Sequence, residues 1–223
     1  MQNLNPAHES PSYLPHAAVS PRAAVWSLLT GMALALPLVY LMRLLPLPAS
    51  DAQMLHTSAA RIADWVPHPW RLAFRAVLLF PVLEECVYRG LILQMLRRYL
   101  PLWLAVLVPT VIFAATHLGF SWDNAVQALI LGVIFAGLAL RSRSLFPAIL
   151  CHAGVNLASL FVLRPVFLAA GLDTPDAATR PLALFWLAGS LVVAVAGVRI
   201  LAAEFGRREP GLAVPAALPL ASA

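Results

Sequence analysis

FPVLEECVYRGLIL, residues 80–93, carries the adjacent carboxylates of Glu84 and Glu85 and the guanidinium of Arg89 within a long apolar segment. A charged side chain at the centre of a membrane-spanning helix costs about 2.5–3.5 kcal/mol. Three in one segment would cost roughly 8 kcal/mol if nothing compensated them. They are therefore expected to face the interior of a helical bundle, to pair with one another and to mark a functional path.

The composition around this stretch is that of a membrane protein. Of the 223 residues, 61% are hydrophobic and only 11% are charged, whereas a soluble domain is about half apolar and about a quarter charged. The net charge of +5 comes entirely from arginine, because the chain contains no lysine. These arginines are scattered around apolar segments and form no basic run, which favours a membrane surface over a nucleic-acid partner.

Continuous apolar runs predict an all-α, polytopic membrane bundle of about six transmembrane helices, because hydrocarbon leaves no backbone group unpaired. The expected spans cover residues 23–45, 70–96, 101–118, 125–140, 144–163 and 181–203. The segment HTSAARIADWV, residues 56–66, is typical of an interfacial amphipathic helix. Residues 1–21 and 207–223 are expected to be disordered, which leaves residues 22–206 as one helical domain with a motif core at 70–160.

The distribution of arginine predicts the orientation of this bundle. With six spans, the side that holds both termini also holds short turns tipped with arginine, so both termini are expected to be cytoplasmic. The absence of lysine is typical of a GC-rich bacterial genome. The predicted location is therefore the inner (plasma) membrane, with several passes.

Helical spacing separates the roles of the three charged residues. Glu85 and Arg89 are four residues apart, so they share a helix face and can form an ion pair. Glu84 lies about 100° around the helix from Glu85 and about 140° from Arg89. Glu84 is thus the carboxylate left outside the pair. A buried carboxylate of this kind can act as a proton acceptor.

Two further predicted spans carry polar residues at the same spacing. His152 and Asn156 are four residues apart, as are Phe113 and His117, so one shared cavity could collect all three helix faces. A single intramembrane histidine is often only an interhelical hydrogen-bonding residue. Together with Glu84, however, the histidines and the amide favour a functional cluster.

Three motifs in this order have a counterpart among known proteins. EECVYRG (Glu84 to Gly90), FAATH (Phe113 to His117) and HAGVN (His152 to Asn156) resemble the pattern of the CAAX-processing and bacteriocin-processing family of intramembrane proteases. This family, abbreviated CPBP, includes the type II CAAX prenyl endopeptidases. Each motif alone is weak, but three in order on separate predicted spans form a specific pattern.

The resemblance implies hydrolysis of a peptide bond in a membrane-associated protein or peptide. Glu84 would be the general base that activates water, and His117 would help to hold that water. His152 and Asn156 would stabilise the oxyanion, with Glu85 and Arg89 as supporting residues. This fits the residues themselves, since a buried base, an imidazole and an amide suit acyl transfer without a serine or cysteine nucleophile.

Two alternatives stay open at this point. Glu84, His117 and His152 form a ligand set that some catalytic zinc sites use, although the family resemblance implies a metal-free glutamate mechanism and no His-Glu-x-x-His stretch is present. The cluster could also serve a transport or proton-relay protein. Many transporters contain internal repeats, and the absence of a detectable repeat in this sequence argues against that alternative. The partners predicted in either case are the lipid bilayer and, for the protease, a membrane protein or peptide.

Overall fold

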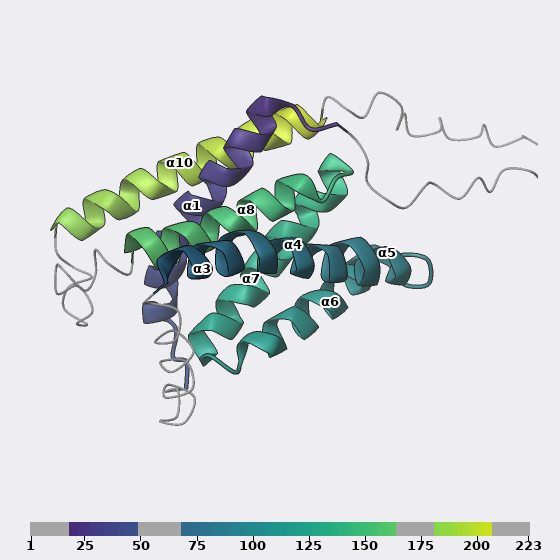
Figure 1. The fold of residues 1–223 in the computed structure, drawn as a ribbon, viewed down its shortest axis with the longest axis horizontal. Helices are drawn as coiled ribbons and strands as arrows, with labels where there is room; N and C mark the ends of the chain where they lie inside the picture. The colour runs from purple at the N-terminus through teal and green to yellow at the C-terminus, as the bar shows by residue number, and fades with distance from the viewer. Residues whose placement is uncertain (1–17, 49–67, 164–180, 207–223) are drawn as a thin grey trace, which may run out of the picture.

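The computed structural model describes residues 18–48, 68–163 and 181–206, and within them the chain forms six helical runs. Figure 1 shows their arrangement. The second run is built from α-helical and π-helical (η) pieces joined end to end. The bounds are α1 (Pro21–Leu44); α3 (Pro69–Ala73), η1 (Phe74–Leu79), α4 (Phe80–Glu85), η2 (Cys86–Ile92) and α5 (Leu93–Leu96); α6 (Leu102–His117); α7 (Trp122–Ser142); α8 (Phe146–Leu157) with η3 (Ala158–Leu163); and α10 (Pro181–Gly206).

The expectation of an all-helical membrane bundle agrees with these runs. Each of the six runs overlaps one predicted span, with ends that differ by a few residues. Among the residues that the structure describes, four stretches are long and apolar enough to cross a membrane: Pro21–Met42, Trp122–Ser142, Phe146–Leu163 and Leu184–Gly206. Helix α6 is apolar but shorter. The predicted interfacial helix, most of the N-terminal segment predicted to be disordered and the whole C-terminal tail lie outside the described residues.

Helix boundaries follow from local capping chemistry. Ser20 caps α1, because its Oγ accepts a hydrogen bond of 3.1 Å from the amide of Ala23. Ser121 caps α7 in the same way through the amide of Asn124, also at 3.1 Å. At the other end of α7, Arg143 adopts φ 52°, the left-handed conformation that commonly terminates a helix. These caps fix where α1 and α7 begin and where α7 ends.

Two glycines bring α1 and α8 into close contact. A Cβ atom on Gly31 of α1 would collide with the backbone carbonyl of Cys151, and one on Gly154 of α8 would collide with the backbone of Leu28. Small residues allow membrane helices to approach at the backbone. Helix α1 therefore lies directly on α8, with α10 along its other side (Figure 1).

The second run crosses the remaining helices and carries the charged motif with it. Its η1 and α4 pieces contact α8, while η2 contacts α6 and α7 (Figure 1). Each motif-bearing segment thus borders at least one other. Between α1, α7 and α8, a buried apolar cluster that includes Leu38, Phe135 and Val155 forms the core under this arrangement.

Candidate active site

The predicted ion pair between Glu85 and Arg89 is present and fully buried. Nη1 of Arg89 donates to Oε1 of Glu85 at 2.9 Å, and the two side chains are 1% and 0% exposed. Charge-assisted hydrogen bonds of this length are strong, and burial removes the competing water. The pair is therefore a rigid anchor within the second run.

Arg89 is held by backbone and aromatic groups as well as by the carboxylate. Its Nη2 donates to the carbonyl of Gly132 on α7 at 3.1 Å. Its guanidinium carbon lies 4.7 Å from the ring centroid of Phe113 and 5.4 Å from that of Phe135, with Tyr88 at 5.9 Å. Cation–π contacts of this kind are strongest where water is excluded. Arg89 thereby joins the second run to both α6 and α7.

His152 contacts both glutamates, one through each ring nitrogen. Its Nδ1 lies 3.0 Å from Oε1 of Glu85, and its Nε2 lies 3.5 Å from Oε2 of Glu84. Since a carboxylate only accepts, Nδ1 carries the proton toward Glu85, which orients the ring and directs Nε2 to Glu84. The ring also stacks on Phe135, with centroids 4.7 Å apart and planes at 17°.

Glu84, which the sequence predicts to be buried, differs from Glu85 in exposure. Its side chain is 29% exposed, whereas that of Glu85 is completely buried. Glu84 is thus the carboxylate of the two that a water molecule or a substrate can reach. The sequence prediction that Arg89 pairs with Glu85 is confirmed, and the contact partner of Glu84 is an imidazole from α8.

His117 lies near the cluster at the end of α6. Its Nδ1 is 2.9 Å from the carbonyl of Phe113, so this nitrogen donates. That hydrogen bond leaves Nε2 of His117 as the nitrogen that can accept from a water molecule. The ring of Phe113 makes edge contacts with both His117, at 4.6 Å, and His152, at 5.8 Å. Phe113 is therefore the common neighbour of the two imidazoles.

Asn156 is placed one turn beyond His152, but its amide is engaged with the second run. Its Nδ2 donates to the backbone carbonyl of Ala76 in η1 at 2.7 Å. The side chain is partly buried. One N–H of the amide is thus committed to a backbone contact, and the second N–H is the one that could serve an oxyanion.

The three residues named for a zinc site do not form a metal-ligand set. Among the residues the structure describes, no group of three or more histidine, cysteine, aspartate or glutamate side chains is placed to hold a metal ion. Oε2 of Glu84 and Nε2 of His152 lie 3.5 Å apart, a separation that two ligands of one ion could also have, but among the described residues no third such side chain is placed with them. We therefore derive no step through a metal.

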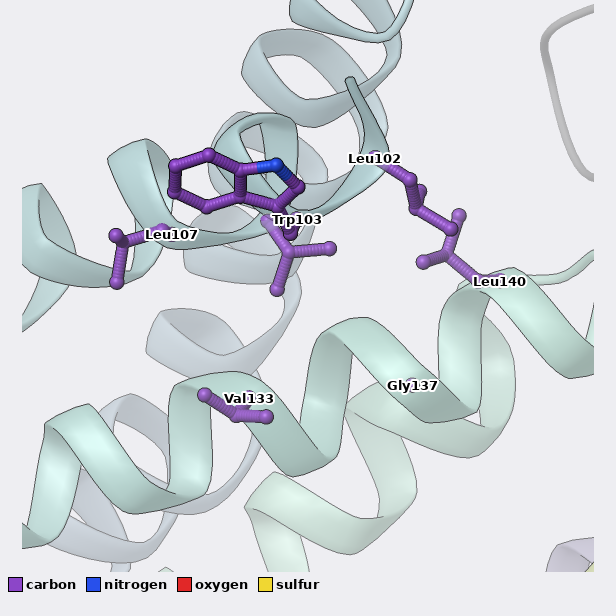
Figure 2. A pocket seen from close by; sticks show the side chains of 7 residues that line it. Leu102, Trp103, Leu107, Val133, Gly137 and Leu140 are labelled. Carbon is purple, nitrogen blue, oxygen red and sulfur yellow. The ribbon is translucent and has the colours of Figure 1, made fainter. Parts of the chain in front are cut away.

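A hollow on the outside of the bundle is separate from this cluster. It measures about 660 Å³ and lies between α6 and α7. Figure 2 shows its apolar lining, with Trp103 and Leu107 on α6 facing Val133, Gly137 and Leu140 on α7. It includes neither glutamate nor either histidine, so it contributes nothing to the chemistry of the cluster.

Sequence reasoning missed three residues that hold the cluster together. Phe135 stacks on His152, Gly132 supplies a carbonyl to Arg89, and Gln94 donates from Nε2 to the carbonyl of Arg89 at 3.0 Å. Phe135 and Gly132 lie in a run of small and apolar residues without a polar signal. Gly132 and Phe135 are three positions apart, so they share one face of α7. The sequence does not show that this face packs against the cluster, because that depends on which helix lies beside it.

Two glycines on α7 give a matched test of this packing. A Cβ on Gly132 would lie 2.7 Å from Cγ2 of Thr110 and 3.0 Å from Nη2 of Arg89, whereas a Cβ on Gly137 would meet nothing within 4 Å. Gly132→Ala is expected to destabilise the chain by about 1–3 kcal/mol through overpacking. Gly137→Ala is expected to stabilise it by about 0.5–1 kcal/mol through helix propensity. Thermal unfolding of the purified variants in detergent measures both, and equal shifts would contradict the packing around Arg89.

Comparison with known proteins gives one match. Residues 66–158 match the family model described as Type II CAAX prenyl endopeptidase Rce1-like. The match runs from just before α3 into η3 and includes all six candidate site residues. No curated protein and no solved structure matches the chain.

Proposed function

We propose that the chain is a protease of the Rce1-like type II CAAX prenyl endopeptidase family, whose model residues 66–158 match, and that it hydrolyses its substrate with water activated by Glu84. The substrate class is a membrane-associated protein or peptide. The observation that supports this most directly is the bridge formed by His152, which contacts Glu85 through Nδ1 and Glu84 through Nε2. Such a bridge orients an imidazole beside a reachable carboxylate.

In the proposed reaction Glu84 acts first as a base and then as an acid. Its carboxylate takes a proton from a water molecule while the water oxygen bonds to the carbonyl carbon of the scissile peptide. The carboxylic acid then returns that proton to the peptide nitrogen as the carbon–nitrogen bond breaks. Nε2 of His117 accepts a hydrogen bond from the attacking water and so fixes its direction.

The negative charge on the tetrahedral intermediate needs donors on the opposite side of the carbonyl. His152 is one candidate donor, because the carboxylate of Glu85 at Nδ1 orients its ring and its Nε2 lies beside Glu84. The second N–H of Asn156 is the other candidate donor. Glu85 and Arg89 act through His152 and through the fixed position of the second run.

We also propose that the second run and α6 lie within the membrane with the four long spans. Their exposed apolar side chains include Leu78, Leu91 and Trp103, which are 55%, 63% and 64% exposed, and large exposed apolar surfaces mark contact with lipid or protein. Both termini would then be on the cytoplasmic side. Water would reach Glu84 from one face of the bilayer, which agrees with the partial exposure of that carboxylate.

A comparison of peptide ends tests the proteolytic function without a known substrate. Membranes from cells that make the natural chain or the Glu84→Gln chain would be labelled at free amino groups and analysed by mass spectrometry. We expect new N-termini of membrane-associated proteins or peptides only with the natural chain. Identical sets of N-termini at equal amounts of inserted protein would contradict the proposed role of Glu84.

A further inference from the structure

The carbonyl of Ala76 lies where the helix of the second run cannot complete its own hydrogen bonds. In a helix it would accept from the amide four residues on in an α-turn or five residues on in a π-turn. The amide of Phe80 donates instead to the carbonyl of Arg75. The residue five positions on is Pro81, which has no N–H. Both backbone donors that would ordinarily serve the Ala76 carbonyl are therefore diverted or missing.

Asn156 supplies the donor that the backbone does not. Its Nδ2 reaches across from α8 to the Ala76 carbonyl at 2.7 Å. Ala76 is buried, with 7% of its surface exposed, and a buried carbonyl without a partner is costly. We infer that Asn156 is a positioning residue: it compensates for the missing N–H of Pro81 and thereby fixes the register of α4, which carries Glu84 and Glu85.

The register matters because the π-helical turns end where α4 begins. The amide of Phe80 still donates to the carbonyl of Arg75, five residues before it, as in a π-helix. Glu84 follows Phe80 by only four residues. A π-turn rotates each following side chain relative to an uninterrupted α-helix. If η1 reverted to an α-helix, the glutamates would turn relative to His152 on α8. The Asn156 hydrogen bond joins α8 to η1, so the helix that carries His152 also holds the turn that aims Glu84.

A double-mutant cycle tests this compensation. Asn156→Leu keeps the side-chain volume and removes the donor, so the apparent melting temperature of the purified full chain in detergent is expected to fall by about 3–8 °C. Pro81→Ala restores a backbone N–H that can pair the carbonyls of η1. In the Pro81→Ala background the same Asn156→Leu change is expected to cost less than about half as much. An equal loss in both backgrounds would overturn the inference.

Gln94 provides a matched control for this cycle. Its amide also donates to a backbone carbonyl of the second run, that of Arg89 at 3.0 Å, but no proline lies among the residues that would serve that carbonyl. The fall in melting temperature caused by Gln94→Leu is therefore expected to be the same in the natural chain and in the Pro81→Ala chain. Rescue of both leucine variants by Pro81→Ala would show a general stabilisation and would overturn the specific pairing.

Hydrogen exchange gives a second measurement that does not depend on the folding of Pro81→Ala. In the Asn156→Leu chain, the amides of residues 74–85 are expected to exchange faster than in the natural chain, because η1 and α4 lose their tie to α8. Residues 125–140 on α7 serve as the reference segment. Unchanged exchange over residues 74–85 would overturn the inference.

The effect on cleavage rests on the proposed function and is tested with a substrate found in the N-terminal comparison. Asn156→Leu is expected to lower kcat by about 10-fold or more. Pro81→Ala is expected to restore the part that comes from the position of α4, while the part that comes from the second N–H of Asn156 stays lost. Recovery of stability without recovery of kcat would overturn the positioning role in favour of direct contact with the substrate. Persistence of cleavage in the Glu84→Gln chain would instead contradict the proposed function, while the melting cycle would still decide the pairing of Ala76.

Discussion

The Glu84→Gln chain is expected to insert and fold like the natural chain and to cleave its substrate about 10²–10⁴-fold more slowly. Glutamine keeps the size of the side chain and its reach toward His152, but it cannot take a proton from water at neutral pH. Because Glu84 lies outside the Glu85–Arg89 ion pair, this change leaves that buried salt bridge intact and alters the contact with Nε2 of His152. Single-turnover cleavage in detergent or in liposomes measures the loss.

Glu204 offers a matched control for this experiment. It is a carboxylate on α10, a helix that carries none of the three motifs, and its Oε1 lies 3.7 Å from Nη1 of Arg22 on α1. Glu204→Gln makes the same chemical change and is expected to leave the cleavage rate within about twofold of the natural chain. A Glu84→Gln chain that cleaves as fast as the Glu204→Gln chain would remove Glu84 from the catalytic mechanism.

Arg89→Met is expected to have the largest effect on stability, with a loss of about 3–5 kcal/mol in the free energy of unfolding. The methionine fills much of the same volume but leaves the carboxylate of Glu85, which is 0% exposed, without its cation. The hydrogen bond to the Gly132 carbonyl is lost as well. Thermal and chemical unfolding of the purified chain, followed by circular dichroism, measures the change.

The companion variant separates the buried charge from the lost packing. In Glu85→Gln/Arg89→Met the uncompensated charge is gone, while the glutamine oxygen can still accept from Nδ1 of His152. Replacing both members of a buried pair is often close to neutral, so the double variant is expected to recover at least half of the stability lost in Arg89→Met. A double variant as unstable as the single one would show that the aromatic and backbone contacts of Arg89, and not its charge pairing, dominate.

Much of the fold and part of the site could be predicted because they depend on local spacing. The helical runs follow from apolar length, and the Glu85–Arg89 pair follows from a separation of four residues on one helix. The sequence predicted only that Glu84 and His152 would lie in one shared cavity. The structure adds that His152 contacts both glutamates, one through each ring nitrogen. The catalytic roles of Glu84, His117, His152 and Asn156 stay predictions.

What could not be predicted depends on contacts between helices or on departures from ideal geometry. Phe135 and Gly132 carry no polar atom in their side chains, so nothing in the sequence distinguishes them from other core residues of α7. The π-helical turns change the rotation per residue around Glu84, whereas sequence periodicity assumes an uninterrupted α-helix. The bond from Asn156 to Ala76 depends on such a turn and on Pro81, whereas the family resemblance implied only the role of an oxyanion donor for Asn156.

The glycine contact between α1 and α8 has a consequence for any shortened form of this chain. Gly154 lies between His152 and Asn156 in the chain, and it packs against the backbone of α1. Helix α1 precedes the family match at residues 66–158. A fragment cut at the limits of that match would retain every candidate catalytic side chain and lose the helix on which α8 rests. We therefore expect that a fragment needs α1, from the serine that caps it onward, to keep His152 and Asn156 in place.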